Sequence, residues 1–368
     1  MLKQNGTLVK FASMGCLALG LGIQSAHAFT VISFDGKAAR WDTSKSIQVQ
    51  YDPNFGGINA AEPITSSIAS WRNVSGINAP VSNPVSKTIA GTPKYDGVNQ
   101  IKFYKAGWQS LPFAPPTSAL AVTISTYNND GQILDADMFI NGENFDWGVV
   151  KTDGEQIHDI QNVVTHEFGH FLGLNHTSEN AMEPDMDRYN ATMFYASLPG
   201  ETFRRSLDKL DIYGIQHLYT TDSMPEPTFD EISPKELQVD YKGSATFEIF
   251  GDNFLPTTSV VFARAGYDGD IVGRVIAVQS NKITVSFDMS NMQSGEYDLV
   301  VANSYNTFVR SDNAFNLTNS TVLGTYNSDS ANSTDGGSQG CHSNGSSSIL
   351  FFLLPLLFIL PRRIKATA

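Results

Sequence analysis

Cysteine is almost absent from this sequence of 368 residues, which contains only Cys16 and Cys341. Residues 29–317 contain none, so this part of the chain forms no disulfide and relies on a hydrophobic core and on any metal that it binds. Basic residues are also few: 24 Lys and Arg stand against 37 Asp and Glu, which gives a formal net charge of −13. Because nucleic-acid binding requires a basic surface, we expect no nucleic-acid partner.

Long hydrophobic runs are missing as well, and no apolar stretch reaches the ~20 residues of a straight transmembrane helix. Near the N-terminus, Lys3 and Lys10 form a basic region before the apolar stretch 11–23, and Ala26-His27-Ala28 has the small-residue pattern of a cleavage site. We therefore predict that residues 1–28 are a signal peptide and that the protein is exported. A retained N-terminal anchor is the alternative.

The C-terminal region has two compositionally distinct parts. Residues 318–348 are rich in Ser, Asn, Gly, Thr and Asp and are predicted to be a disordered linker. Residues 349–368 contain a short apolar run, broken by Pro355, and then two arginines. Together they resemble bacterial sorting tails, which implies partners in the export and tail-processing machinery and a transient membrane attachment. A permanent short anchor is the alternative; either way, the protein is expected to be secreted or held at the cell surface.

The most informative motif is H-E-x-x-H-x-x-G-x-x-H, which runs from His166 to His176. Histidines four residues apart lie on one face of a helix, so His166 and His170 can reach the same metal ion. Gly173 can adopt the left-handed conformation that ends a helix, and the turn brings His176 back as a third nitrogen ligand. Three protein ligands leave the fourth position of a tetrahedral zinc open for water, and Glu167 lies where a general base for that water is needed.

A non-functional interpretation of the motif is two surface histidines with a solvated glutamate. It suits a bare H-E-x-x-H, but the glycine and the third histidine at fixed offsets argue against coincidence. The preceding sequence favours a helix with a buried face, because Asp159 suits an N-cap. An apolar stripe follows it at helical spacing: Ile160, Val163, Val164 and Phe168.

With this motif the chain resembles the metzincin metallopeptidases, and among them the matrixins. Metzincins carry a methionine in a tight turn beneath the zinc, and the segment Ala191-Thr192-Met193-Phe194 resembles this Met-turn. Met182 lies closer to His176 and is the competing choice. We prefer Met193 because residues 206–219 follow it and resemble the final matrixin helix, with Ser206 as its N-cap. An ordinary core methionine would be buried in the same way.

The matrixin resemblance covers about residues 38–220. Residues 47–51 resemble the opening strand, 64–71 the first long helix, and 119–123 and 131–141 the two strands before the active-site helix. The resemblance implies an α+β domain over residues 29–221, an α/β/α-type arrangement with a twisted mixed sheet and the active-site helix. It also implies that a peptide substrate lies along the sheet edge, and that residues 194–200 line the pocket for the side chain after the scissile bond. The edge residues would be Ala119, Leu120, Ala121 and Val122.

The chain departs from animal matrixins in several places. Too few histidines remain outside the triad for a second, structural zinc, and there is no propeptide cysteine for latency. The acidic segment 177–190 is longer than usual, and we interpret it as a solvated loop; a calcium site is the alternative, because clustered carboxylates suit a hard cation.

Tyr195 follows Met193 by two residues. In astacins and serralysins a tyrosine there can approach the zinc, as a fifth ligand or oxyanion stabiliser, whereas the matrixin-like flanks here favour packing in the substrate-pocket wall.

Beyond a polar, proline-containing linker at 220–227, the periodicity changes from helical to alternating. Five short strands are predicted, which are typical of an all-β sandwich over residues 222–317: 245–251, 259–263, 274–278, 282–287 and 297–302. The sequence resembles an immunoglobulin-like domain of the IPT/TIG type, on the residues Ile232-Ser233-Pro234, Phe250-Gly251-Asp252-Asn253-Phe254 and Gly295-Glu296-Tyr297-Asp298-Leu299. A passive spacer and a substrate- or surface-binding module are both open roles.

These patterns together predict an exported, monomeric zinc endopeptidase that acts on proteins or peptides. Zinc would lower the pKa of its bound water to near 7, and Glu167 would take up the water proton and deliver it to the leaving amine. The rival hypothesis is a surface adhesion or binding protein that retains the scaffold without cleaving. The complete ligand set with Glu167 argues against it, because a decayed enzyme need not keep its base.

Overall fold

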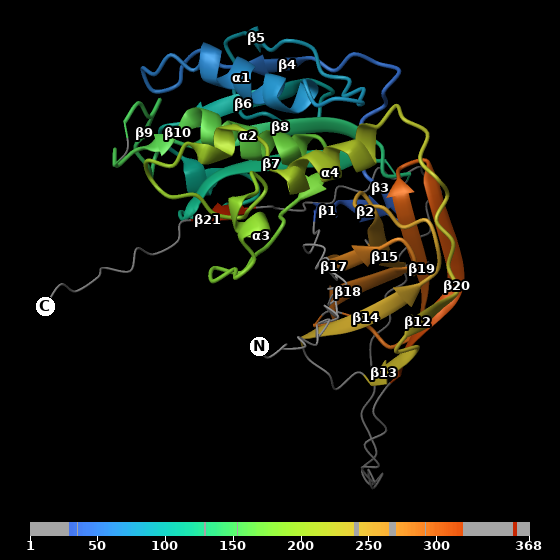
Figure 1. Ribbon diagram of the computed structural model, residues 1–368. Coiled ribbons are helices and arrows are strands. Elements are labelled where there is room, and N and C mark those ends of the chain that lie inside the picture. Colours follow the sequence, from blue (N-terminus) through green and yellow to red (C-terminus); the bar gives the residue numbers. More distant parts are fainter. Residues whose placement is uncertain are drawn as a thin grey trace, which may run out of the picture.

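The computed structural model describes residues 29–318, except for 35, 129, 153, 239–242, 265–269 and 291, and also the backbone of residues 356–358. Helices and a mixed sheet form the first half of the chain, and two further sheets form the second half (Figure 1). The predicted signal peptide, the predicted linker beyond Thr318 and most of the predicted sorting tail lie outside the described residues; Thr318 itself ends a strand. No helix in the described part is long and apolar enough to cross a membrane.

A six-stranded sheet forms the centre of the first half, in the order β21-β7-β8-β6-β4-β5. Strands β8, β6, β4 and β5 run parallel, whereas β7 pairs antiparallel with β8 and β21 pairs antiparallel with β7. The strand bounds are β4 Val49–Tyr51, β5 Val85–Ser86, β6 Asn99–Tyr104, β7 Ala119–Tyr127, β8 Ile133–Asn141 and β21 Leu356–Phe358. Three two-stranded pairs accompany this sheet: β1 Thr30–Val31 with β11 Leu174–Asn175, β2 Ser33–Phe34 with β3 Lys37–Ala38, and β9 Trp147–Gly148 with β10 His158–Asp159.

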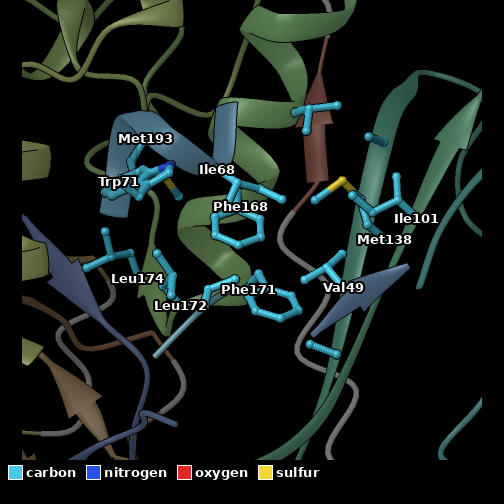
Figure 2. Packing of buried hydrophobic residues seen from close by; sticks show 14 of the residues in the cluster. Val49, Ile68, Trp71, Ile101, Met138, Phe168, Phe171, Leu172, Leu174 and Met193 are labelled. Carbon is cyan, nitrogen blue, oxygen red and sulfur yellow. The ribbon is translucent and has the colours of Figure 1, made fainter. Parts of the chain in front are cut away.

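Two long helices pack together over this sheet (Figure 2). They are α1, Ala61–Arg72, and α2, Ile160–Phe171. The Trp71 indole N–H of α1 donates to the carbonyl of Thr165 in α2 at 2.8 Å. Apolar side chains of both helices meet those of the sheet in one buried core, which includes Val49, Ile68, Trp71, Ile101, Met138, Phe168 and Phe171. This core holds the motif helix rigidly beside β7 and β8.

Helix α4, Lys209–Tyr219, corrects one predicted helix start. Its N-cap is Asp208, not Ser206, because Asp208 and Asp211 form a reciprocal capping box at the first turn. The Ser206 hydroxyl instead bonds to the carbonyl of Phe203. The remaining helical segments are short: α3 Met186–Asn190, and single 3₁₀ turns at Trp108–Ser110 and Phe203–Arg205.

Two sheets surround a separate hydrophobic core in the second half. Stacked phenylalanines form its centre, with the ring centroids of Phe262 and Phe287 4.0 Å apart and those of Phe262 and Phe315 4.9 Å apart. One sheet contains β12 Glu231–Ser233, β14 Ser244–Phe250, β18 Lys282–Asp288 and β17 Arg274–Gln279. The other contains β13 Glu236–Gln238, β20 Thr307–Thr318, β19 Gly295–Ser304, β15 Ser259–Ala263 and β16 Ile271–Val272. All five predicted strands are present, and β20 is a long strand that the alternation analysis did not identify.

The two halves are in direct contact through α4 and the β2–β3 turn. His217 of α4 is buried, with Nδ1 2.9 Å from the carbonyl of Thr257 and its own carbonyl accepting from the Tyr305 amide. The Asp270 carboxylate accepts from Ser33 Oγ at 2.7 Å and from the Gly36 amide at 2.6 Å. The second half therefore packs against the helical half over a specific, hydrogen-bonded interface.

This interface is expected to make folding sensitive to acid. Burial lowers the pKa of His217 from 6.5 to about 4, so the unfolded chain binds a proton more tightly than the folded chain does. The stabilisation is complete above pH 6.5 and is lost as the pH falls from 6.5 to 4, by about 3 kcal/mol in total for this one group. Urea unfolding of the wild type and of His217→Gln at pH 7 and pH 4 should show a smaller pH-dependent loss in the variant. An equal loss in both proteins would contradict the assignment.

Candidate active site

Contacts at both ends fix the position of helix α2. At its start, Asp159 is the N-cap as predicted: its carboxylate accepts from the Asn162 amide at 2.8 Å and binds the guanidinium of Arg205. At its end, Gly173 has a φ of +104°, outside the range that side-chain-bearing residues favour. A Cβ on Gly173 would lie 2.2 Å from the carbonyl oxygen of Ala39, so only glycine fits. The turn at Gly173 directs the chain back toward the helix.

The three histidines of the motif meet after this turn. Nε2 of His170 lies 3.1 Å from Nε2 of His166 and 3.2 Å from Nε2 of His176, and the potential ligand atoms of all three lie within 4.8 Å of one another. All three residues are buried. Burial, followed by the neighbouring imidazoles, lowers the pKa of His166 and of His170 well below the ordinary value, so both rings are neutral at neutral pH.

The other ring nitrogens show which way the lone pairs point. Nδ1 of His166 lies 2.7 Å from the carbonyl of Thr192, and Nδ1 of His170 lies 2.9 Å from the carbonyl of Leu174. A carbonyl only accepts, so Nδ1 carries the hydrogen in both rings and Nε2 is left with a lone pair. The Nε2 lone pairs of His166 and His170, with the two atoms 3.1 Å apart, repel one another unless a cation lies between them. Zinc with nitrogen ligands at about 2.0–2.1 Å in tetrahedral geometry fits this donor set.

Glu167 lies on the same helix, fully buried next to the triad. Its Oε2 lies 2.6 Å from the hydroxyl of Thr123 on β7, whereas Oε1 has no hydrogen-bond partner among the described protein groups. Burial raises the pKa of Glu167 to about 8, and the hydrogen bond from Thr123 opposes this effect. A buried carboxylate with one oxygen anchored and the other unpartnered is suited to exchange a proton with a ligand.

Met193 lies in the main core next to Trp71 (Figure 2). A Cβ on Gly169 would come within 2.2 Å of the Met193 sulfur, so the absence of a side chain at Gly169 makes this close approach possible. The buried carboxylate of Asp211 holds the turn by accepting from the amides of Thr192 at 2.8 Å and Met193 at 3.0 Å. The competing Met182 is 77% exposed. Of the two methionines, Met193 is thus the one packed against the motif helix.

Comparison with known proteins assigns the first half of the chain. The family model described as Matrixin, of the peptidase M10 group, matches residues 26–220, more than half of the 368 residues. The chain belongs to the matrixin family. Together with the buried histidine cluster, membership supports a metallopeptidase that uses zinc.

No curated protein sequence matches this matrixin significantly. Among solved structures it is similar to a protein of unknown function from Bacteroides thetaiotaomicron, with 17% identity over 26% of this chain and 22% of the other, at a TM-score of 0.22. The Ig1-2 module of the Drosophila receptor protein tyrosine phosphatase DLAR has 14% identity over 27% and 52% of the chains, at a TM-score of 0.20. A β-glucosidase from Listeria innocua has 11% identity over 80% and 49%, at a TM-score of 0.22. The matrixin thus spans only about a fifth to a half of these chains.

Tyr195 packs beside the histidine triad. Tyr195 is 8% exposed, and its ring centroid lies 6.4 Å from that of His176 and 5.0 Å from that of Phe194. Burial, and then the charge of Glu179, raise the pKa of Tyr195 above its ordinary value, so the hydroxyl stays protonated at neutral pH. The tyrosine is therefore a neutral hydroxyl group at the edge of the site.

Strand β7 contains the residues predicted to form the substrate edge. Ala119 to Val122 are buried, and their outer side is paired with β21, in the register Leu356 with Val122 and Phe358 with Ala119. Strand β21 lies in red next to β7 in Figure 1. Strand β21 runs antiparallel to β7, and an added peptide strand could continue the sheet in the same direction. In this structure, the edge of the matrixin sheet is covered by its own chain.

The acidic segment 177–190 uses its carboxylates in local contacts. Asp185 caps α3 and lies 3.6 Å from Nε of Arg188, and Asp187 lies 2.5 Å from Nζ of Lys209. Glu183 accepts from the Ser178 hydroxyl. Within the part of the chain that the structure describes, the histidine triad is the only group of three or more metal-binding side chains that lie close together. The calcium alternative therefore has no support.

Proposed function

We propose that this matrixin is a zinc-dependent endopeptidase that cleaves extracellular proteins. The observation that carries the proposal is the convergence of the Nε2 atoms of three buried histidines beside a buried glutamate. One carboxylate oxygen of this glutamate is hydrogen-bonded, and the other has no partner among the described protein groups. His166, His170 and His176 would hold the metal. Zinc in such a site lowers the pKa of a bound water and polarises the carbonyl of a substrate.

The role of Glu167 follows from its surroundings. Thr123 holds one carboxylate oxygen, so the orientation of the other is fixed before any substrate arrives. Glu167 would accept a proton from water through its unpartnered oxygen and pass it to the leaving amine. The backbone carbonyls of Thr192 and Leu174 accept hydrogen bonds from Nδ1 of His166 and His170 and so hold the orientation of these two imidazoles.

We further propose that the substrate peptide adds to β7 as an antiparallel strand. The direction and register of β21 on Ala119 to Val122 support this mode, since an extended segment already forms hydrogen bonds there. A substrate would have to replace β21 along this edge. Tyr195, whose ring packs against Phe194, would then belong to the wall of the adjoining pocket.

The second half is proposed to be an immunoglobulin-like domain of the IPT/TIG type. Its two sheets around one phenylalanine core support this, as do the contacts through His217 and Asp270, which favour a fixed attachment over a flexible spacer. Export through residues 1–28 and tail processing near the C-terminus, with a secreted or surface location, remain proposals made from the sequence.

The proposed activity is tested by metal removal. The purified full chain, loaded with zinc, is expected to cleave casein or gelatin, and treatment with 1,10-phenanthroline should abolish cleavage until zinc is added back. Zinc content measured in parallel should be close to one atom per chain. A protein that holds zinc yet shows no chelator-sensitive cleavage would instead support the rival hypothesis of a non-catalytic surface protein.

A further inference from the structure

The third histidine differs from the other two in the partner of its Nδ1. His166 and His170 face backbone carbonyls, but Nδ1 of His176 lies 2.5 Å from Oε1 of Glu179. The His176 side chain is only 2% exposed, whereas that of Glu179 is 66% exposed. Glu179 is thus a surface side chain whose carboxylate reaches inward to a buried ring. The sequence marked it only as one of several acids in a solvated loop.

His176 also needs such a partner more than the other two histidines do. His166 and His170 are fixed by α2, which is rigidly packed in the core. His176 lies beyond the Gly173 turn, after the short strand β11, where no helix restrains the ring. Its backbone carbonyl accepts from the Thr30 hydroxyl, but this contact does not orient the imidazole.

The backbone around Glu179 is itself held against the Met-turn segment. The amide of Thr177 donates to the carbonyl of Met193 at 2.9 Å, and the amide of Tyr195 donates to the carbonyl of Ser178 at 3.4 Å. Ser178 and Phe194 form a β-bridge. The main chain that carries Glu179 is therefore anchored immediately before that residue, with the carboxylate within hydrogen-bond reach of His176 Nδ1.

We propose that Glu179 is a positioning residue for the metal site. By accepting the hydrogen of His176 Nδ1, it selects the tautomer with a free Nε2 and holds the ring plane so that this lone pair points toward the other two. The inference rests on the proposed metal site but not on catalysis. Partners of this kind typically contribute 10- to 100-fold to metal affinity.

The test measures zinc affinity of the full chain by competition with a chromophoric chelator. Glu179→Ala is expected to weaken zinc binding 10- to 100-fold. Glu179→Gln should restore most of it, because the amide oxygen can accept the same hydrogen bond. Asp187→Asn, in the same loop, removes a negative charge that pairs with Lys209 and should leave the affinity unchanged. Since Glu179 is largely exposed, the thermal unfolding of the metal-free variants should match that of the wild type.

The absorption spectrum of the cobalt-substituted chain gives a second readout. Its visible bands should change in Glu179→Ala, where His176 is free to rotate, and should be close to wild type in Glu179→Gln. Unchanged zinc affinity in Glu179→Ala, or a Glu179→Gln variant as weak as Glu179→Ala, would overturn the proposal. Cleavage is not needed for either readout. A chain that binds zinc but cleaves nothing would refute the peptidase and leave the role of Glu179 intact.

Discussion

Replacing Glu167 with glutamine is expected to lower kcat on a peptide substrate by about 10²–10⁴-fold while zinc binding persists. Glutamine has nearly the shape of glutamate and can keep the hydrogen bond to Thr123, so the buried site should not collapse. It cannot accept a proton from water. The loss should therefore appear in kcat, with KM little changed, since Glu167 acts on the reacting atoms and not on the bound peptide.

The control for this experiment is Thr123→Ser, which retains a hydroxyl at the same position of β7. It should keep most of the activity, because one oxygen of Glu167 would still be held. Zinc content is measured for each variant to separate lost metal from lost chemistry. A Glu167→Gln chain with full zinc and more than a tenth of the wild-type kcat would exclude Glu167 as the base.

Replacing Gly173 with alanine is expected to have the largest effect on the fold around the metal. The residue has a φ of +104°, and its new Cβ would come within 2.2 Å of the Ala39 carbonyl oxygen. Main chain cannot move aside as a flexible side chain can. We expect a loss of about 3–5 kcal/mol in the free energy of unfolding. A marked loss of zinc affinity should accompany it, since the turn places His176.

Gly57 provides a matched control. Its φ is +90°, but no atom lies within 4 Å of a Cβ built on it. Gly57→Ala therefore reports backbone strain without a clash, and should cost about 1–2 kcal/mol with zinc affinity unchanged. Both quantities come from urea unfolding and chelator competition. Equal effects of the two substitutions would show that the contact with Ala39 does not matter.

Local patterns in the sequence predicted much of the motif helix. The N-cap at Asp159 is confirmed because capping depends on residues three apart, which a single sequence shows directly. The same reasoning was wrong at Ser206, where a capping box two residues later competes better. The alternation of apolar residues identified five strands of the second half but not β20, whose exposed positions do not alternate regularly.

The supporting residues of the site could not be predicted in this way. Thr123 meets Glu167 across 44 positions in the chain, and Asp211 meets Met193 across 18. No periodicity connects such pairs, because their proximity depends on how strands and helices pack. Glu179 is near His176 in sequence, yet its proposed role depends on which way the His176 ring faces, which a sequence does not show. The contact between the two halves through His217 is a tertiary feature of the same kind.

Helix α4 connects the turn that contains Met193 with the second half of the chain. Asp211 in its first turn holds the amides of Thr192 and Met193, and His217 six residues later contacts the β-sandwich through Thr257. Six residues of helix span about 9 Å, so one short helix joins the two contacts. A displacement of the second half at Thr257 would therefore act through this one helix on the turn that contains Met193.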